Sequence, residues 1–470
     1  MKGRARVLVV KKSVRNISLI CVVVCAGCSG VVGASGDAGP SADAAPSVID
    51  AAPTPGPDAA PDRDAAPPDA PARDAAPLDL DAAIVDPPAR PAGPIDALLA
   101  PLPASTWVVL PDTLMQRVCP GYVDGQPGNH YLCDAVMTAW SGGAFDEARD
   151  RLLVYGGGHA DSFYNQVFAF DLGTMRWMVL SAPTRDATPE TTQPWLNEPF
   201  YEPCGYYPNG DYPIDEAWRR PEYRDFIQPA LCTGPDILPR LDRQQPRSTH
   251  TYGNLAYVPG FDALCTTGSI GMWRSGQSAT AVTACFDLSR RVWHQAANVT
   301  RPGYGMSAVD SQGHVWLLHD AGLHEFSPET NTWTARGDGL GTLYASVAIE
   351  PGSDTLYVLT PGTSTLVARD LRNAASTFQP RAAPPAGLTR QNPGFAWVPH
   401  LSRFYAWAGG RTLYVYDPAR DTWTTESGGG DDPGDPANNG TYGRFRASAN
   451  RRVLVVASST ERSVAVYKLP

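Results

Sequence analysis

Short runs of alternating apolar and polar residues, each ended by turn residues, dominate the chain from about residue 104 onward. The clearest example spans residues 151–177 (RLLVYGGGHADSFYNQVFAFDLGTMRW). Leu152 to Tyr155 is a short apolar run ended by three glycines, and Gln166 to Leu172 alternates again. Alternation over a few residues between turn residues predicts β-strands, and three adjacent glycines predict a turn.

A second pattern repeats along the same region. An aromatic residue followed by Asp or Ser precedes a tryptophan that lies six residues beyond the Asp or Ser. The copies are Phe170-Asp171 with Trp177, Phe286-Asp287 with Trp293, Phe326-Ser327 with Trp333, and Tyr416-Asp417 with Trp423. A degenerate copy has Asp370 and Phe378, and successive copies from Trp293 onward are 40 to 45 residues apart. This spacing is typical of a four-stranded propeller blade.

The combined pattern of strand, glycines, strand, aromatic-Asp and Trp resembles the kelch repeat, the blade unit of β-propellers such as the central domain of galactose oxidase. The resemblance implies an all-β, kelch-type β-propeller. We count six blades and keep seven as the alternative, since seven-bladed propellers are common. The predicted blades are residues 134–183, 247–298, 302–337, 342–381, 390–427, and 440–470 together with 104–110.

The last predicted blade joins the two ends of the propeller. The final copy has strands at 453–457 and 464–469 and then no outer strand, whereas Thr106 to Leu110 is an isolated strand with Trp107 where the blade tryptophan belongs. The N-terminal and C-terminal strands are therefore predicted to share one blade, which closes the ring and removes exposed sheet edges.

The first 27 residues predict an export signal. A basic segment precedes the apolar run Ile17 to Val24, which is too short to span a bilayer comfortably, and Cys25-Ala26-Gly27-Cys28 follows. Small residues before a cysteine resemble the bacterial lipoprotein signal, although Cys25 stands where Leu is usual. The resemblance implies lipidation of Cys28 and an anchor in the outer membrane or cell surface of a Gram-negative-type bacterium. An ordinary cleaved secretion signal is the alternative.

Residues 28–103 predict a disordered tether. The segment is rich in Ala, Pro and Asp and has few apolar side chains to offset the entropy of ordering. Its acidic bias accounts for much of the net charge of −10. We therefore attribute the charge to the tether more than to the domain at 104–470.

The cysteine count supports export. After removal of the signal and lipidation of Cys28, six of nine cysteines remain. An even number in an exported domain predicts disulfides, and pairing of sequence neighbours is the simplest arrangement. The predicted pairs are Cys119–Cys133, Cys204–Cys232 and Cys265–Cys285. Metal ligation is the rival, but these six cysteines include no C-x-x-C pair.

The candidate site residues collect where loops meet one face of a propeller. The innermost strand of each blade starts at that face, called the top, so the segments before inner strands surround the mouth of the central channel. Arg, His and Tyr recur there, and an Arg fork suits carboxylate or sulfate while aromatic faces suit sugar rings. The candidate ligand-binding residues are Arg247, Trp273, Arg301, Tyr304, Arg390, Tyr442 and Arg444. A long insertion at about 184–245, rich in Pro, Tyr and Trp, could wall a cleft or simply pack on the blades.

Two functions from different classes follow. The first is recognition of an extracellular, anionic glycan by the top mouth of the channel. The second is a polysaccharide lyase that cleaves a uronate polymer by β-elimination, with the GGGH loop, a later His-x-Tyr and an Arg resembling the layout in propeller-fold ulvan lyases. The implied catalytic residues are His159, His250 and Tyr252 for proton transfer and Arg274 for charge neutralisation.

Other chemistries have weaker support. A copper radical oxidase needs two Tyr, two His and a thioether-linked Cys, whereas all six mature cysteines can be accounted for as disulfides. Asp124 and Asp161 could serve a glycosidase, but nothing specifies their separation. The histidines at 294, 314, 319, 324 and 400 fall in or near predicted strands, and we interpret them as structural. We expect no cofactor or metal, no nucleic acid, a monomer, and membrane contact only through the lipid on Cys28.

Overall fold

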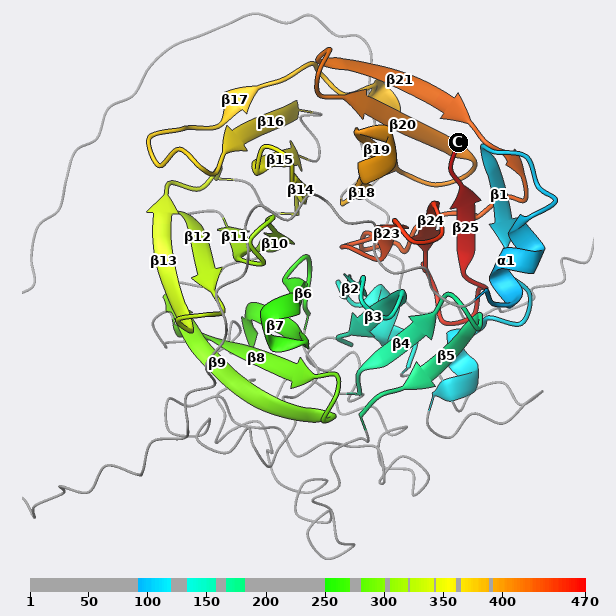
Figure 1. The fold of residues 1–470 in the computed structure, drawn as a ribbon, viewed down its shortest axis with the longest axis horizontal. Coiled ribbons are helices and arrows are strands. Elements are labelled where there is room, and N and C mark those ends of the chain that lie inside the picture. Colours follow the sequence, from blue (N-terminus) through cyan, green and yellow to red (C-terminus); the bar gives the residue numbers. More distant parts are fainter. Residues whose placement is uncertain are drawn as a thin grey trace, which may run out of the picture. The chain divides into compact units, whose positions relative to one another are not determined.

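The computed structural model describes residues 92–119, 133–157, 166–181, 250–270, 280–300, 305–319, 322–341, 344–360, 365–388 and 392–470. The chain divides into two units, Met1–Asp81 and Ala82–Pro470, and all described residues lie in the second. That unit is a six-bladed β-propeller, built from six small antiparallel sheets arranged in a ring (Figure 1).

Five blades are four-stranded sheets of consecutive strands. Blade 1 holds β2 (Gly142–Asp146), β3 (Arg151–Tyr155), β4 (Phe168–Asp171) and β5 (Arg176–Val179). Blade 2 holds β6 (Leu255–Val258), β7 (Ala263–Ile270), β8 (Thr280–Asp287) and β9 (Val292–Thr300). Blade 3 holds β10 (Met306–Val309), β11 (Val315–His319), β12 (Gly322–Ser327) and β13 (Thr332–Gly337). Blade 4 holds β14 (Ser346–Glu350), β15 (Thr355–Thr360), β16 (Thr365–Asp370) and β17 (Gln379–Pro380). Blade 5 holds β18 (Gly394–Val398), β19 (Arg403–Trp407), β20 (Thr412–Asp417) and β21 (Thr422–Ser427).

Blade 6 closes the ring with strands from both ends of the propeller. From the centre outward it holds β23 (Phe445–Ser448), β24 (Val453–Val456), β25 (Ala465–Lys468) and β1 (Thr106–Val109). Trp107 lies opposite Tyr467 in the antiparallel β1–β25 pair. A two-residue strand β22 (Gly429–Gly430), which the sequence did not predict, pairs in parallel with the outer edge of β1. The predicted six blades and the shared closing blade are therefore confirmed.

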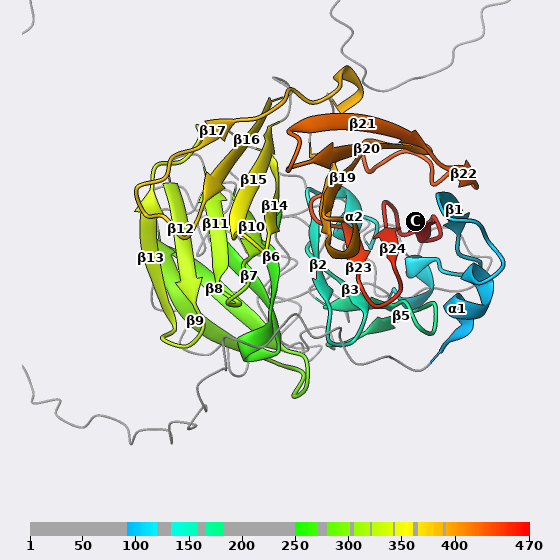
Figure 2. The same cartoon turned by 45° about the horizontal axis from the view of Figure 1, so that its top comes forward.

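The first strand of each blade lies nearest the centre, as Figure 1 shows for all six blades; Figure 2 shows β2, β6 and β14 in a tilted view. Neighbouring inner strands contact each other around the ring, from β2 through β6, β10, β14 and β18 to β23 and back to β2. All six inner strands therefore start at the top of the channel, and the loops that follow them lie at the opposite end.

The repeated tryptophans link adjacent blades. Each packs on the aromatic residue opposite it in its own blade. Four of the five indoles also reach a main-chain carbonyl outside that blade, whereas the buried Nε1 of Trp293 has no partner among the described residues. Trp333 packs on Phe326 with ring centroids 5.1 Å apart, and its Nε1 donates to the carbonyl of Ala297 in blade 2 at 2.9 Å. The same donation runs from Trp423 to Ala382, from Trp107 to Arg411, and from Trp177 to Thr113. This shared geometry supports a structural role for the repeated Trp.

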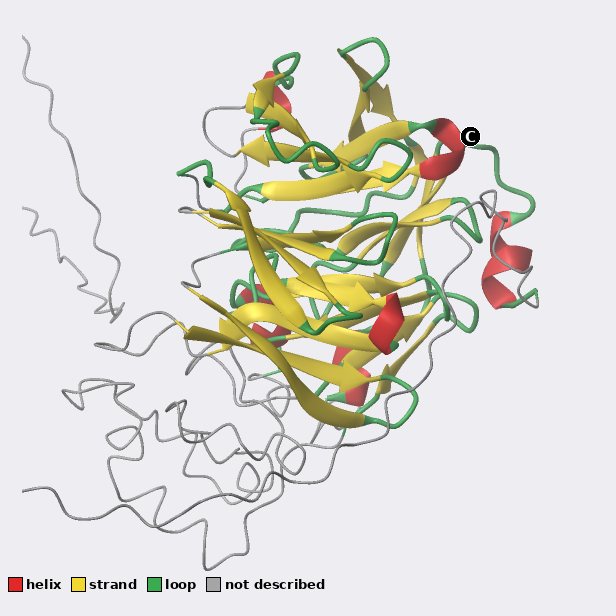
Figure 3. Ribbon diagram, turned by 60° about the vertical axis from the view of Figure 1, so that its left-hand side comes forward, coloured by secondary structure: helices red, strands yellow, loops and turns green. Residues whose placement is uncertain are grey.

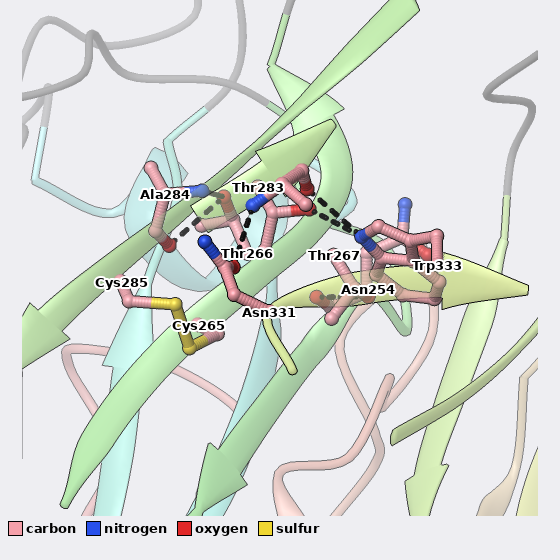
Figure 4. The surroundings of a disulfide bond; sticks show 10 residues. Asn254, Cys265, Thr266, Thr267, Thr283, Ala284, Cys285, Asn331 and Trp333 are labelled. Carbon is pink, nitrogen blue, oxygen red and sulfur yellow. Dashed lines mark hydrogen bonds between the residues drawn. A yellow bond between two sulfur atoms is a disulfide. The ribbon is translucent and has the colours of Figure 1, made fainter. Parts of the chain in front are cut away.

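Two of the predicted disulfides are present. Cys119 bonds to Cys133, and Cys265 bonds to Cys285 across β7 and β8. Figure 4 shows the second bond beside the Thr266–Ala284 hydrogen bonds of the same strands and the Trp333 indole that reaches Thr283. Cys204 and Cys232 lie outside the described residues.

The described helices are short and lie outside the sheets (Figure 3). Helix α1 (Pro94–Leu99) precedes β1, and α2 (Ala135–Thr138) precedes β2; the 3₁₀ turns are η1 (Met115–Val118), η4 (Pro259–Phe261), η5 (Ala386–Leu388) and η6 (Pro399–Leu401). Ile95 and Leu99 of α1 are buried in the core cluster shared by blades 1 and 6, so the folded unit extends upstream of the predicted start at 104. Among the described helices, none combines the length and the apolar character that crossing a membrane requires.

Candidate functional site

The entrances to the inner strands share an uncommon backbone conformation. In five blades a non-glycine residue just before the inner strand has a φ between 44° and 63°, in the left-handed region. This conformation costs about 1 kcal/mol or more per residue for side chains with a Cβ, and such residues gather at functional sites and tight turns. They are Trp140, Tyr252, Tyr344, Asn392 and Tyr442.

These residues also join neighbouring blades through their main chain. The carbonyl of Trp140 accepts the N–H of Tyr252 at 2.7 Å, and the carbonyl of Tyr442 accepts the N–H of Gly143 at 2.9 Å. The carbonyl of Asn392 accepts the N–H of Thr441 at 2.9 Å. The left-handed backbone is therefore part of how the ring is held together at its top.

The side chains at these positions form an aromatic collar, which we define as Trp140, His250, Tyr252, Tyr344 and Tyr442. The Tyr252 ring lies 5.8 Å from that of Tyr344 and 5.7 Å from that of Tyr442, measured between centroids. The imidazole of His250 lies 4.8 Å from the Trp140 ring. The collar thus brings together residues of blades 1, 2, 4 and 6 at the top of the channel.

The hydroxyl groups of two collar tyrosines differ in their hydrogen bonding. The Tyr252 hydroxyl lies 3.3 Å from His250 Nδ1, so the two side chains share a hydrogen bond. The Tyr442 hydroxyl is buried and has no hydrogen-bond partner among the described residues. Burial raises the pKa of Tyr442, and the Tyr344 side chain adds to this shift. The Tyr442 hydroxyl is therefore protonated at neutral pH and can donate a hydrogen bond.

Buried polar groups without partners lie beside the collar. The side-chain amides of Asn254 and Asn392 and the Thr441 hydroxyl are buried and lack a partner within the part of the chain that the structure describes. Asn254 precedes β6, Asn392 precedes β18, and Thr441 adjoins Tyr442. Because buried polar atoms in folded proteins are nearly always hydrogen-bonded, this end of the channel has donors and acceptors to offer to water or a ligand.

Arg444, a predicted ligand-binding residue, has a different environment. Its side chain is fully buried, and its guanidinium donates to the carbonyls of Ser141, Ala457 and Gly440 at 3.0, 2.7 and 2.7 Å. Burial lowers its pKa to about 10, which still leaves it charged at neutral pH. Arg444 therefore locks blade 6 to blade 1, and in this conformation it cannot reach a ligand.

The described residues include His250, Tyr252, Tyr442 and Arg444 from the predicted site, and the structure brings the first three together in the collar. The sequence analysis missed Trp140 and Tyr344. Their position two residues before an inner strand, which Tyr304 shares, was the available signal. The other predicted residues lie outside the described part of the chain: Cys28, His159, Arg247, Trp273, Arg274, Arg301, Tyr304 and Arg390.

The opposite end of the channel contains a cavity of about 350 Å³. Every inner strand contributes one alanine to its lining: Ala144, Ala256, Ala308, Ala348, Ala396 and Ala447. Glu147 and Arg446 also line it. The Glu147 side chain is exposed to the channel, but protein atoms surround it on several sides. This surrounding protein, with the charges of Asp150 and Asp146, raises the pKa of Glu147 to about 8. The small methyl groups leave the channel open, whereas large rings occupy the collar end.

Two histidine clusters lie in blade 3. His314 Nδ1 is 2.6 Å from Glu325 Oε1 and 4.0 Å from Asp310 Oδ2, a grouping that could hold a cation. Arg336 already pairs with Glu325, and its positive charge opposes a metal there. His319 and His324, five residues apart in sequence, stack with Nε2 and Nδ1 3.1 Å apart. That contact was not predicted from their spacing.

Comparisons with known proteins add little about chemistry. No protein-family profile matches the chain, and no curated protein matches its sequence. Among solved structures, a structural genomics protein of unknown function from Bacteroides thetaiotaomicron is 9% identical with a TM-score of 0.37, covering 69% of this chain and 68% of that one. A fungal alcohol oxidase of the AA5 family, in complex with copper, is 10% identical with a TM-score of 0.38, covering 72% and 75%. At these values we draw no conclusion from either protein, and the fold assignment rests on the six sheets themselves.

Proposed function

We propose that this propeller binds a carbohydrate at the aromatic collar. The observation that carries the proposal is the convergence of Trp140, Tyr252, Tyr344 and Tyr442 with His250 at the top of the channel. Aromatic rings offer flat apolar faces against which the C–H faces of sugar rings can pack, with polar edges for hydrogen bonds. The Tyr442 hydroxyl and the Asn392 amide, which are buried and have no partner among the described residues, lie beside these rings and could supply such polar groups.

The ligand class that we propose is an anionic glycan. Arg247, Arg301 and Arg390 precede the inner strands of blades 2, 3 and 5 in the sequence. Guanidinium groups near the collar would pair with carboxylate or sulfate groups on the polymer. The proposed charge of the ligand thus rests on the sequence positions of these arginines, whereas the proposed aromatic site rests on the distances between the collar rings.

The test is a binding titration of the purified full-length chain with neutral, uronate-containing and sulfated polysaccharides. Tyr344 is the most informative position because it is only half-buried. We expect Tyr344→Ala to weaken binding about tenfold through loss of the stacking face, and Tyr344→Phe to change it by less than about twofold. Tyr414→Ala, a half-buried tyrosine on β20, is the control and should bind like the wild type. Equal affinity for wild type and Tyr344→Ala would reject the collar as the site.

A lyase is the second candidate, and the Tyr252–His250 hydrogen bond is the observation that favours it. A phenol and an imidazole in contact are suited to donate and accept protons in β-elimination. Incubation with uronate polymers should then produce an unsaturated uronate that absorbs in the ultraviolet. Tyr252→Phe should abolish this product while leaving polymer affinity near wild type; no product from the wild-type chain would leave only binding.

We also propose that the chain is exported and held at the outer membrane or cell surface by a lipid on Cys28. The support is the Ala26-Gly27-Cys28 sequence after a basic and apolar leader, and residues 28–103 would act as the tether. Labelled fatty acid should be incorporated in the expressing bacterium by the wild-type chain and not by Cys28→Ser. Incorporation into the variant would reject this anchor.

A further inference from the structure

A second pocket lies between blades 3 and 4, away from the inner strands. It encloses about 170 Å³, and six of its lining residues carry polar groups: Trp316, Glu325, Arg336, Arg369, Arg372 and Asn373. Glu325 and Trp316 face each other in neighbouring strands of blade 3. Arg369 is the penultimate residue of β16 in blade 4, and Arg372 and Asn373 follow that strand. Neither end of the channel shares a residue with this pocket.

Arg336 and Arg372 have carboxylate partners. Arg336 Nε donates to Glu325 Oε2 at 2.5 Å, and Arg372 Nε donates to Asp354 Oδ2 at 3.0 Å. Glu325 could oppose an anion in the pocket, but its charge is balanced by Arg336 and by the contact with His314 Nδ1 at 2.6 Å. Because these arginines are paired with carboxylates, the unbalanced positive charge of the pocket comes from Arg369.

Arg369 has no ion pair with a carboxylate among the described residues, although only 6% of it is exposed. Its Nη2 donates to the main-chain carbonyl of Arg336 at 2.5 Å, and its guanidinium lies 5.7 Å from the centre of the Phe378 ring. Burial lowers its pKa, and the negative charge of Asp338, an exposed residue, raises it only in part. Burying a positive charge without a negative charge beside it lowers the stability of the folded state.

We propose that this pocket binds an oxyanion group, with Arg369 as the principal binding residue and Arg336, Arg372 and Asn373 beside it. A planar guanidinium at the wall of a small cavity can donate two parallel hydrogen bonds to sulfate, phosphate or carboxylate. The volume accepts one such group and a few atoms attached to it. The group could be a free anion or a substituent of a larger molecule, and both sources present the same chemistry. This inference does not depend on the collar or on carbohydrate binding there.

The test is isothermal titration of the purified full-length chain with sodium sulfate, phosphate and acetate at constant ionic strength. The wild type should show saturable one-site binding. Arg369→Gln should weaken it at least about tenfold, and Arg372→Gln by a smaller factor. Arg420→Gln, an exposed arginine paired with Asp417 in blade 5, is the control and should leave the affinity unchanged.

Two further arms complete the experiment. Glucose 6-sulfate is titrated beside sulfate and glucose: tighter binding of the sulfated sugar identifies a substituent on a larger molecule, and equal binding identifies a free anion. Circular dichroism checks that Arg369→Gln is folded, and if it is not, the more exposed Arg372 provides the decisive variant. No saturable binding by the wild type, or equal binding by wild type and both pocket variants, would overturn the proposal.

Discussion

Arg444 and Arg369 are both buried arginines at seams between blades, but their guanidinium groups have different hydrogen-bond partners. At the closing seam between blades 6 and 1, the Arg444 guanidinium reaches three main-chain carbonyls. At the seam between blades 3 and 4, Arg369 reaches one carbonyl and borders an open pocket. Arginine thus stabilises the interface between blades 6 and 1, whereas between blades 3 and 4 it is a candidate binding group. The difference lies in how many hydrogen-bond acceptors surround the guanidinium.

The closing seam also carries a second charged link. Asp150 of blade 1 is buried and accepts from the Ser448 hydroxyl at 2.5 Å and from Arg451, which also pairs with Asp96 of α1. Arg446 of the same seam donates to the carbonyl of Gly143 at 3.3 Å. These contacts join the C-terminal strands of blade 6 to blade 1, and together with the β1–β25 pairing they close the ring.

The largest effect is expected from Arg444→Met. Loss of the guanidinium leaves three buried carbonyls without donors, and we expect the free energy of unfolding to fall by about 3–5 kcal/mol. Chemical denaturation measures this value, and Arg411→Met, on an exposed residue, is the control. A loss below about 1 kcal/mol would mean that Arg444 does not lock the seam.

Asp150→Asn should have the next largest effect. The substitution keeps the shape of the side chain but removes one of two carboxylates that pair with the buried Arg451. Since Asp96 remains, we expect a loss of about 2–3 kcal/mol rather than the full cost of an unpaired charge. The double variant with Asp96→Asn should lose more than the sum of the two single variants; simple additivity would contradict the shared link.

Arg369→Met should change the free energy of unfolding by less than about 1 kcal/mol in buffers without oxyanions, in either direction. The lost hydrogen bond to Arg336 is offset by removal of a buried charge. Denaturation in the same buffer as the Arg444 series gives a direct comparison of the two seams. A loss as large as that of Arg444→Met would show that Arg369 is also a lock, and the contrast would fail.

The smallest effect concerns pH. Burial, with the charges of Asp150 and Asp146, raises the pKa of Glu147 from 4.5 to about 8, so the folded chain holds a proton that the unfolded chain releases above 4.5. The stability of the wild type relative to Glu147→Gln should therefore fall as the pH rises from about 4.5 to about 8 and stay level above it. Denaturation at several pH values measures the difference. A pKa of about 8 sets the upper limit of this change; because Glu147 is exposed to water, which screens the neighbouring carboxylates, we expect a smaller shift and the smallest effect of the series. A difference that does not vary with pH would exclude a raised pKa.

The fold could be predicted from the sequence because its signals are local. Alternating residues define each strand, and the aromatic residue before the Asp or Ser lies opposite its tryptophan in the sheet, as Phe326 does with Trp333. The two-residue period of the strands and the fixed spacing between the aromatic residue and its tryptophan can both be recognised within a short segment of sequence. The isolated strand at Thr106–Val109 and the incomplete last blade together predicted that this strand completes the last blade and closes the ring, as it does.

The roles of individual side chains were decided by the tertiary structure. Arg444 and Ser141 are 303 positions apart, and nothing in either local sequence shows that the guanidinium meets that carbonyl. The stacking of His319 on His324 and the lack of a carboxylate beside the buried Arg369, among the described residues, likewise depend on which groups the folded blades place around them. Strands follow from the order of residues along a few positions, whereas charge and hydrogen bonding depend on acceptors that come together only when the ring closes.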